Sequence, residues 1–329
     1  MTDKYQKIKT GVIGVGSMGQ NHARIYSEIS DLVGVAELNR EQGRQVADRF
    51  GVKWYENYED MLSEVDCVSI AVPTFLHKEI SEIVTKQGVH ILVEKPLASN
   101  VKDAESIIAS AKFNKVILSV GQIERHNTVL RKAKELLDSG KYGKIITISA
   151  RRFSSYPLRI DDVGVLFDLT IHDVDAISYL MDKPAKYVFS TGGKYRNQYH
   201  EDYVNLSITY SDNKIGLCET NWLTPIRVRE IIIITDICHM YVNYLTQEIK
   251  IHALEDNNKS GKVIGDLENI REENIVLKNS EPLKNEILDF LSSISNNEQP
   301  LVSGQDGLNA VKIVEAGLRS LNSNKVIKL

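Results

Sequence analysis

The first 122 residues alternate between short apolar runs and segments with helical periodicity. The apolar runs are TGVIGV, LVGVAE, KWY, CVSIAV, VHILVE and VILSV, at residues 10–15, 32–37, 53–55, 67–72, 89–94 and 116–120. Strands that are apolar on both faces are typical of a parallel sheet covered by helices on both sides. The pattern therefore predicts a doubly wound sheet of about six parallel strands, an α/β Rossmann domain.

Beyond residue 122 the pattern changes. Helical periodicity appears over 127–139 and 164–182, and a strand is predicted over 145–153. The later strands alternate between apolar and polar positions: YVFSTG, YVNLSITY, IGLCETNW, REIIIIT and QEIKIH. Turns such as SDNK join neighbouring strands, which favours a largely antiparallel sheet. Two helices, over 282–294 and 305–321, follow these strands. We therefore predict two domains, 1–122 and an α+β domain over 123–329.

The composition excludes few classes of protein. The 329 residues are 42% hydrophobic and 26% charged with a net charge of −4, which indicates an ordinary globular protein without general affinity for nucleic acid or anionic membranes. No apolar run approaches the ~20 residues of a membrane helix, and the N-terminus lacks the apolar core of a secretory leader. Cys67, Cys218 and Cys238 lie far apart, so we expect reduced thiols and a cytoplasmic protein.

A G-x-G-x-x-G motif lies between the first predicted strand and the first predicted helix, at Gly14, Gly16 and Gly19. Gly14 allows a tight turn, Gly16 allows a pyrophosphate to approach the backbone, and Gly19 allows the helix to pack on the strand. Ser17 and Met18 open the helix, whose free N–H groups favour phosphate. The motif in this position predicts a dinucleotide site rather than a plain glycine turn.

Glu37 closes the second strand, 18 residues after Gly19. A carboxylate there accepts hydrogen bonds from the adenosine ribose and repels a 2′-phosphate, so NAD is favoured over NADP. Arg40 lies close enough to soften that preference. The alternative interpretation is that Glu37 is a surface glutamate without a role in cofactor binding. FAD uses the same motif, but no second flavin signature is evident.

Two more segments follow strands on the expected cofactor side of the sheet. Glu94-Lys95-Pro96 comes directly after the fifth strand, where ligands of open α/β sheets bind. Lys95 could equally be a surface lysine. Pro73, Thr74 and His77 follow the fourth strand, and we expect them near the cofactor. His77 could instead be a first-turn helix residue without a role.

Asp168 and His172 are four residues apart in a helical pattern and are expected to share one face. Oxidation of an alcohol requires removal of the hydroxyl proton, which histidine accepts near neutral pH. A capping aspartate with an exposed histidine is the alternative. The pair lacks a convincing third ligand, so no metal site is predicted. Asp236 and His239 are discounted for the same reason.

Together, GVIGVGSMGQNHARIY, AVPTFLHKE, EKP and D-x-x-x-H-D-x-D resemble the Gfo/Idh/MocA oxidoreductase family. The resemblance implies that Lys95 contacts substrate and nicotinamide and that His172 is the general acid–base, supported by Asp168. It also implies a cis Lys95–Pro96 bond. Thr170 stands where the family pattern has glycine.

Further segments, GQIERHN (121–127), residues 148–175 and ETNWLTP (219–225), resemble the UDP-N-acetylglucosamine 3-dehydrogenase branch. That branch oxidises the sugar C3 hydroxyl to a ketone, which implies a diphosphate near Arg152 and Arg159. Guanidinium groups suit phosphate, although either could be an ordinary surface arginine. Asn127, followed by Thr128 instead of proline, is a candidate for the substrate pocket.

Three alternatives stay open. The substrate could be inositol or a free aldose. The protein could be a non-catalytic NAD-binding regulator, against which Lys95, Asp168 and His172 argue. NAD could also remain bound and be recycled in place. An exposed face of the second sheet would favour a homodimer or homotetramer, which the family resemblance also implies.

Overall fold

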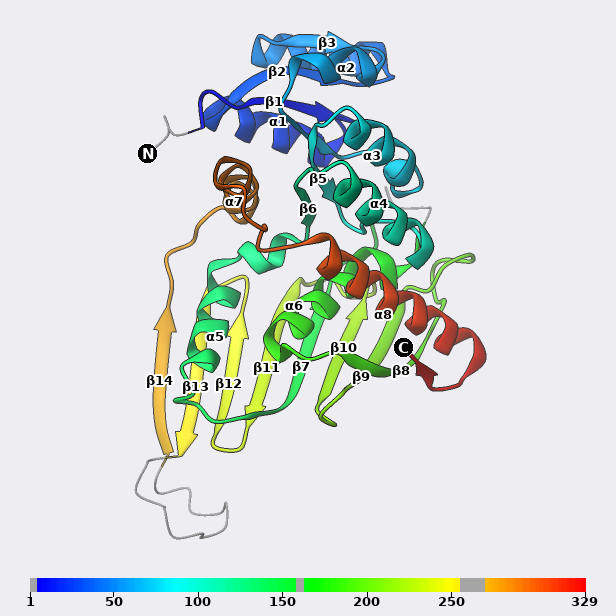
Figure 1. Cartoon of the computed structure of the whole chain (residues 1–329). Helices are drawn as coiled ribbons and strands as arrows, with labels where there is room; N and C mark the ends of the chain where they lie inside the picture. The colour runs from blue at the N-terminus through cyan, green and yellow to red at the C-terminus, as the bar shows by residue number, and fades with distance from the viewer. Residues whose placement is uncertain (1–4, 158–162, 255–269) are drawn as a thin grey trace. The chain divides into compact units, whose positions relative to one another are not determined.

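The computed structural model describes residues 5–157, 163–254 and 270–329, and the chain divides into two compact units (Figure 1). The first unit contains Met1–Ile123 and Glu281–Lys312, and the second contains Glu124–Ser280 and Ile313–Leu329. The first segment of the first unit ends at Ile123, one residue beyond the boundary predicted after residue 122. Residues 281–312 belong to the first unit in the structure, whereas the sequence pattern predicted them in the second domain.

The first unit contains a six-stranded parallel sheet in the order β3-β2-β1-β4-β5-β6. Its strands are β1 (Lys9–Ile13), β2 (Asp31–Ala36), β3 (Lys53–Tyr55), β4 (Cys67–Ile70), β5 (His90–Glu94) and β6 (Leu118–Gly121). Every neighbouring pair is parallel, as expected for strands that are apolar on both faces. The predicted doubly wound sheet is confirmed. The order reverses beside β1, and such a switch point is where open α/β sheets bind ligands.

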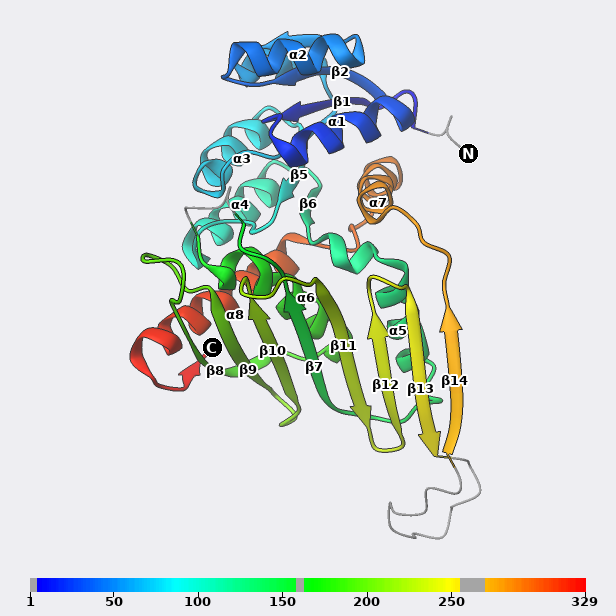
Figure 2. The same cartoon turned by 180° about the vertical axis from the view of Figure 1, so that it is seen from behind.

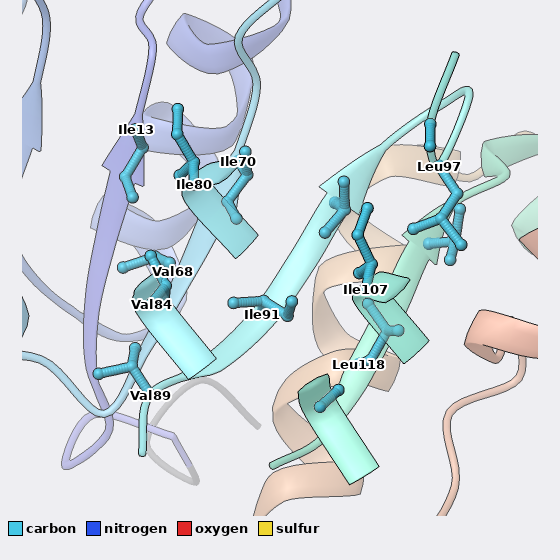
Figure 3. Packing of buried hydrophobic residues seen from close by; sticks show 14 of the residues in the cluster. Ile13, Val68, Ile70, Ile80, Val84, Val89, Ile91, Leu97, Ile107 and Leu118 are labelled. Atoms are coloured by element: carbon cyan, nitrogen blue, oxygen red, sulfur yellow. The ribbon is translucent and has the colours of Figure 1, made fainter. Parts of the chain in front are cut away.

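Helices cover both faces of this sheet. One core joins it to α1 (Ser17–Ile29), α2 (Arg40–Phe50) and α7 (Pro282–Asn296). The other core joins it to α3 (His77–Lys86), α4 (Val101–Phe113) and the first part of α8 (Gly304–Ser323). Figure 3 shows the second core, in which branched aliphatic side chains from the strands meet those of α3 and α4.

The position of α7 explains why 281–312 belongs to the first unit. Leu283, Ile287 and Phe290 lie in the core beside α1. Arg24 and Glu28 of α1 also form ion pairs with Glu281 and Lys284. The apolar face of an amphipathic helix shows that it is buried, but not against which sheet. The sequence pattern therefore predicted the helix without its partner.

The second unit contains, among the described residues, a nine-stranded sheet in the order β14-β13-β12-β11-β7-β10-β9-β8-β15. Its strands are β7 (Ile145–Phe153), β8 (Ala185–Gly193), β9 (Tyr203–Tyr210), β10 (Ile215–Asn221), β11 (Val228–Thr235), β12 (Cys238–Asn243), β13 (Glu248–Leu254), β14 (Ile270–Val276) and β15 (Ile327–Lys328). All pairs are antiparallel except β7 with β10, so the largely antiparallel prediction is confirmed. The polar edge strand β14 was missed because it has no apolar face to detect.

One face of this sheet is covered by helices. These are α5 (Thr128–Asp138), α6 (Ile171–Met181) and the last part of α8 (Figure 1). Figure 2 shows the opposite face, over which the described residues place no helix. The strands alternate accordingly: in β9, Val204, Leu206 and Ile208 are buried while Tyr203 and Asn205 are exposed.

Candidate active site

The glycine turn between β1 and α1 has the geometry that the motif predicts. Gly14 has a φ of +83°, and a Cβ on it would lie 2.8 Å from the carbonyl oxygen of Ala71. A Cβ on Gly19 would lie 1.9 Å from the carbonyl oxygen of Gly14, so only glycine allows α1 to pack this closely. A Cβ on Gly16 would meet no atom within 4 Å, because Gly16 borders open space.

That space is part of a cavity of about 780 Å³ at the carboxyl ends of the strands. Gly14, Gly16, Glu37 and Pro73 all line it. Ser17 and Met18 begin α1, whose N-cap Gly16 makes no side-chain capping bond, so the first-turn N–H groups are available to an anion. An extended cofactor with a pyrophosphate fits this combination of a large cavity and a helix N-terminus.

Glu37 follows β2 directly, and backbone groups orient its carboxylate. One oxygen accepts a hydrogen bond from Val15 N and the other from Asn39 N, both at 3.0 Å. Each carboxylate oxygen has a second lone pair, so Glu37 can still accept bonds from ribose hydroxyls. Arg40 is the first residue of α2 and is exposed.

The loop after β5 carries Lys95 between two buried neighbours. The Lys95–Pro96 peptide is cis, which confirms the expectation from the family resemblance. Glu94 directs its carboxylate to protein groups, namely the Nε2 atom of His22 and the backbone N of Lys95. His77 is 1% exposed and bridges two backbone carbonyls. Thr74 opens the short 3₁₀ helix before α3. The contacts of Glu94 and His77 give both residues a role in loop structure.

Asp168 and His172 lie on consecutive turns of one helical segment in the second unit. Asp168 lies in the π-helical turn η5 (Leu166–Thr170), and His172 is the second residue of α6. Both are half-buried, whereas Asp173 and Asp175 are almost completely buried. π-turns are often found at functional sites. The D-x-x-x-H-D-x-D segment therefore separates into an accessible pair and two structural aspartates.

The two structural aspartates each hold an arginine. Arg152 donates to Asp173 at 2.9 Å and to Glu124 at 2.8 Å. Arg125 donates to both carboxylate oxygens of Asp175 at 2.8 Å. Burial opposes the charge of Arg152, but Asp173 and Glu124 raise the pKa of Arg152 above its ordinary value. These pairs fix α6 to β7 and to the segment before α5.

Two family models match this chain. The oxidoreductase family model with an NAD-binding Rossmann fold (Gfo/Idh/MocA) matches residues 8–122, and the GFO/IDH/MocA C-terminal domain matches 130–236. The chain belongs to the Gfo/Idh/MocA oxidoreductase family. It is an NAD-dependent oxidoreductase that acts on a CH–OH group.

Individual relatives cover nearly the whole chain. UDP-N-acetylglucosamine 3-dehydrogenase from Acidithiobacillus ferrooxidans is 28% identical over 91% of this chain and 93% of its own length. Its crystal structure superposes with a TM-score of 0.87 at 25% identity over 96% of this chain and 98% of that chain. Myo-inositol 2-dehydrogenase from Thermotoga maritima is 26% identical over 98% of both chains. A levoglucosan dehydrogenase in complex with NADH shares the fold, with a TM-score of 0.88 at 19% identity over 98% of this chain and 99% of that chain.

The structure corrects the interpretation of the predicted diphosphate arginines. Arg152 is 2% exposed, and carboxylates occupy its guanidinium group, so it is neither a surface arginine nor available to a phosphate. Arg159 lies outside the described residues. Asn127 is the N-cap of α5, and its side-chain oxygen accepts from Val129 N and from Gln247. These bonds explain Asn127 without a ligand, and its role in the substrate pocket stays a prediction.

Glu201 shapes the turn that contains Asp168 and was not among the predicted site residues. Glu201 is buried, and its carboxylate accepts a hydrogen bond from Leu166 N at 3.1 Å. Its backbone oxygen accepts from Val165 N at 2.9 Å. A Cβ on Gly164 would lie 2.1 Å from its carboxylate, so a larger residue there would displace the Glu201 side chain. No sequence pattern links Glu201 to a helix that begins 35 residues earlier.

Over residues 5–157, 163–254 and 270–329, no group of three or more His, Cys, Asp or Glu side chains is arranged to hold a metal ion. In the same ranges, no helix is both long enough and apolar enough to span a bilayer. Cys67, Cys218 and Cys238 are free and buried.

Proposed function

We propose that this protein oxidises the C3 hydroxyl of UDP-N-acetylglucosamine to a ketone with NAD. The observation that carries the proposal is the similarity to UDP-N-acetylglucosamine 3-dehydrogenase, which extends over both units at 28% identity. The superposition on the structure of that enzyme, with a TM-score of 0.87, supports it. The segments that resemble this branch, at 121–127, 148–175 and 219–225, lie almost entirely in the second unit.

Each proposed catalytic residue has a distinct task. NAD supplies the hydride acceptor when bound. His172 accepts the proton of the sugar hydroxyl, because imidazole is a base near neutral pH. Lys95 stabilises the negative charge that develops on the hydroxyl oxygen. Asp168, one turn before His172, orients the imidazole or the sugar. The half-buried state of Asp168 and His172 supports this assignment, since a reacting group must be reachable by substrate.

Glu37 supports the preference for NAD over NADP. Its carboxylate lines the cavity and is oriented by Val15 N and Asn39 N. A 2′-phosphate on the ribose would place like charges close together, which disfavours NADP. Arg40 is the nearest basic residue along the chain, and we expect it to reduce the selectivity.

An inositol is the second candidate substrate, favoured by the 26% identity to myo-inositol 2-dehydrogenase over 98% of both chains. One assay distinguishes the two proposed substrates. The purified protein is mixed with NAD and either UDP-N-acetylglucosamine, UDP-glucose or myo-inositol, and NADH absorbance is followed. We expect turnover with UDP-N-acetylglucosamine and at least about tenfold lower kcat/KM with the others. Preferential turnover of myo-inositol would replace the first proposal with the second.

We also propose a homodimer or homotetramer that forms through the face of the second sheet opposite its helices. Phe189, Ile215, Leu217 and Ile234 are exposed large hydrophobic residues of this sheet. A depression of about 370 Å³ lies between β7, β8, β9 and β10. Apolar side chains gathered on one face are typical of a subunit interface. The cytoplasmic location remains a prediction.

A further inference from the structure

The residues on either side of Lys95 are each held by a buried histidine from another element of the first unit. His22 of α1 is 0% exposed and contacts Glu94, while His77 of α3 is 1% exposed and contacts Pro96. Lys95 itself is half-buried. Imidazole is costly to bury unless its nitrogens form hydrogen bonds, so both histidines depend on these contacts.

His22 belongs to a chain of side-chain hydrogen bonds that ends at the Lys95 loop. Its Nε2 atom lies 2.9 Å from Glu94 Oε1, and its Nδ1 atom lies 2.9 Å from Ser69 Oγ. Ser69 Oγ in turn lies 2.9 Å from the hydroxyl of Tyr26. A single direction satisfies every group: Tyr26 donates to Ser69, Ser69 donates to Nδ1, and Nε2 donates to the carboxylate.

Glu94 transmits this contact to the backbone of Lys95. Its second oxygen accepts a hydrogen bond from Lys95 N at 3.1 Å. Gly121 faces Glu94 on β6, and a Cβ on Gly121 would lie 3.0 Å from the carboxylate, so the glycine leaves room for it. Burial opposes the charge of Glu94, but the hydrogen bond from His22 keeps the pKa of Glu94 below its ordinary value.

His77 fixes the other side of the loop. Its Nδ1 atom lies 3.0 Å from Pro96 O, and its Nε2 atom lies 3.0 Å from Val72 O. Burial lowers the pKa of His77, although both carbonyl contacts raise it. A neutral imidazole has one N–H and can donate to only one of these two carbonyl oxygens at a time. His77 thereby joins the segment after β4 to the segment after β5.

We propose that His22 and His77 are positioning residues that fix the backbone on both sides of Lys95 and so set the direction of its side chain. This inference rests on the proposed catalytic role of Lys95. His22 also links that loop to α1, the helix that begins at the glycine turn. Neither histidine needs to touch the sugar, because each acts through a neighbour of Lys95. Displacing a reacting group by about 1 Å can reduce a rate about 100-fold.

The sharpest test compares His22→Asn with His22→Gln. Both variants place an amide in the same buried site, but only glutamine is long enough to put a donor where Nε2 contacts Glu94. We expect kcat of His22→Gln within about fivefold of the wild type, and kcat of His22→Asn about 10- to 100-fold lower. Both should bind NADH within about threefold of the wild type, measured by fluorescence titration. His77→Leu should also lower kcat about 10- to 100-fold.

His90→Leu is the matched control. His90 is a half-buried histidine at the opposite end of β5, where its Nδ1 atom accepts a hydrogen bond from Ile117 N. Its loss removes a histidine contact from the same strand without touching the Lys95 loop. We expect an unchanged kcat for His90→Leu. Equal kcat values for His22→Asn and His22→Gln, or a loss in His90→Leu as large as that in His22→Asn, would overturn the proposal.

A second readout does not need a substrate. Lysines are methylated with ¹³C, and the NMR signal of Lys95 is assigned by its loss in Lys95→Arg. The signal should shift in His22→Asn and His77→Leu and stay unchanged in His90→Leu. Unchanged Lys95 signals in both folded variants would contradict the positioning role. If the wild type oxidises no sugar tested, the proposed function fails while this NMR comparison still decides the inference.

Discussion

The two units position their candidate residues in different ways. In the first unit, Gly14, Glu37, Pro73 and Lys95 all lie in short segments that directly follow parallel strands. In the second unit, Asp168 and His172 lie on one helical segment whose place depends on distant residues such as Glu201. A parallel sheet brings its strand ends together from topology alone. An antiparallel sheet with a helix on it needs specific long-range contacts to place a site.

The largest expected effect is a loss of kcat without a loss of NADH affinity. His172→Ala should lower kcat by about 10²- to 10⁴-fold because the hydroxyl proton loses its acceptor. NADH affinity should stay within about twofold of the wild type, since the cofactor cavity is built by the first unit. Steady-state kinetics and NADH titration measure the two effects. The exposed His252 on β13 serves as a control, and His252→Asn should change neither quantity. Near-full activity in His172→Ala would refute the acid–base assignment.

A smaller effect is expected on the free energy of unfolding, for two neighbouring arginines on opposite faces of β7. Arg152→Met removes the guanidinium that contacts the buried carboxylates of Asp173 and Glu124, so it should reduce the free energy of unfolding by about 3–5 kcal/mol. Arg151 is about half exposed and pairs with Glu219, so Arg151→Met should cost less than about 1 kcal/mol. Urea denaturation measures both. A stable Arg152→Met variant with a raised KM for a nucleotide sugar would restore the original diphosphate prediction.

The glycines of the first unit should show smaller, separable effects. Gly19→Ala should cost about 1–3 kcal/mol of stability, because its Cβ would overlap the carbonyl oxygen of Gly14. Gly16 has a φ of −63° and faces open space, so Gly16→Val should fold normally. Its side chain would fill the space next to the helix N-terminus and weaken NADH binding by at least about tenfold. Thermal unfolding and NADH titration distinguish the two. Tight NADH binding by Gly16→Val would place the pyrophosphate elsewhere.

The smallest expected effect is on how stability depends on pH. Burial, together with Arg131 and Arg125, lowers the pKa of His126 to about 3 from an ordinary value of 6.5. Between these values the unfolded chain binds the proton and the folded chain does not, so acidification favours unfolding. Stability should therefore fall as the pH drops from 6.5 towards 3. His126→Gln should show a weaker pH dependence in urea midpoints measured at pH 7 and pH 5. An identical dependence in both proteins would remove His126 as its source.

The sequence predicted the strands and helices of residues 5–123 in the first unit, because their signals are local. Apolar runs gave six strands in the correct order along the chain, and the glycines, Glu37 and Lys95 lie where the motifs imply. The sequence could not predict that α7 packs beside α1, since an apolar helix face does not show which element it packs against. It also could not predict that Arg152 is buried. That outcome depends on Asp173 and Glu124, which lie 21 and 28 residues away along the chain.

Oxidation of the sugar at C3 transfers the hydrogen of that carbon to NAD, so a deuterium label at C3 follows the reaction. UDP-N-acetylglucosamine with deuterium at C3 is incubated with the protein and NAD, and both products are analysed by mass spectrometry. We expect NADH that carries the deuterium and a nucleotide sugar that has lost both the deuterium and the hydroxyl proton. NADH without deuterium, with the label retained in the sugar, would contradict oxidation at C3.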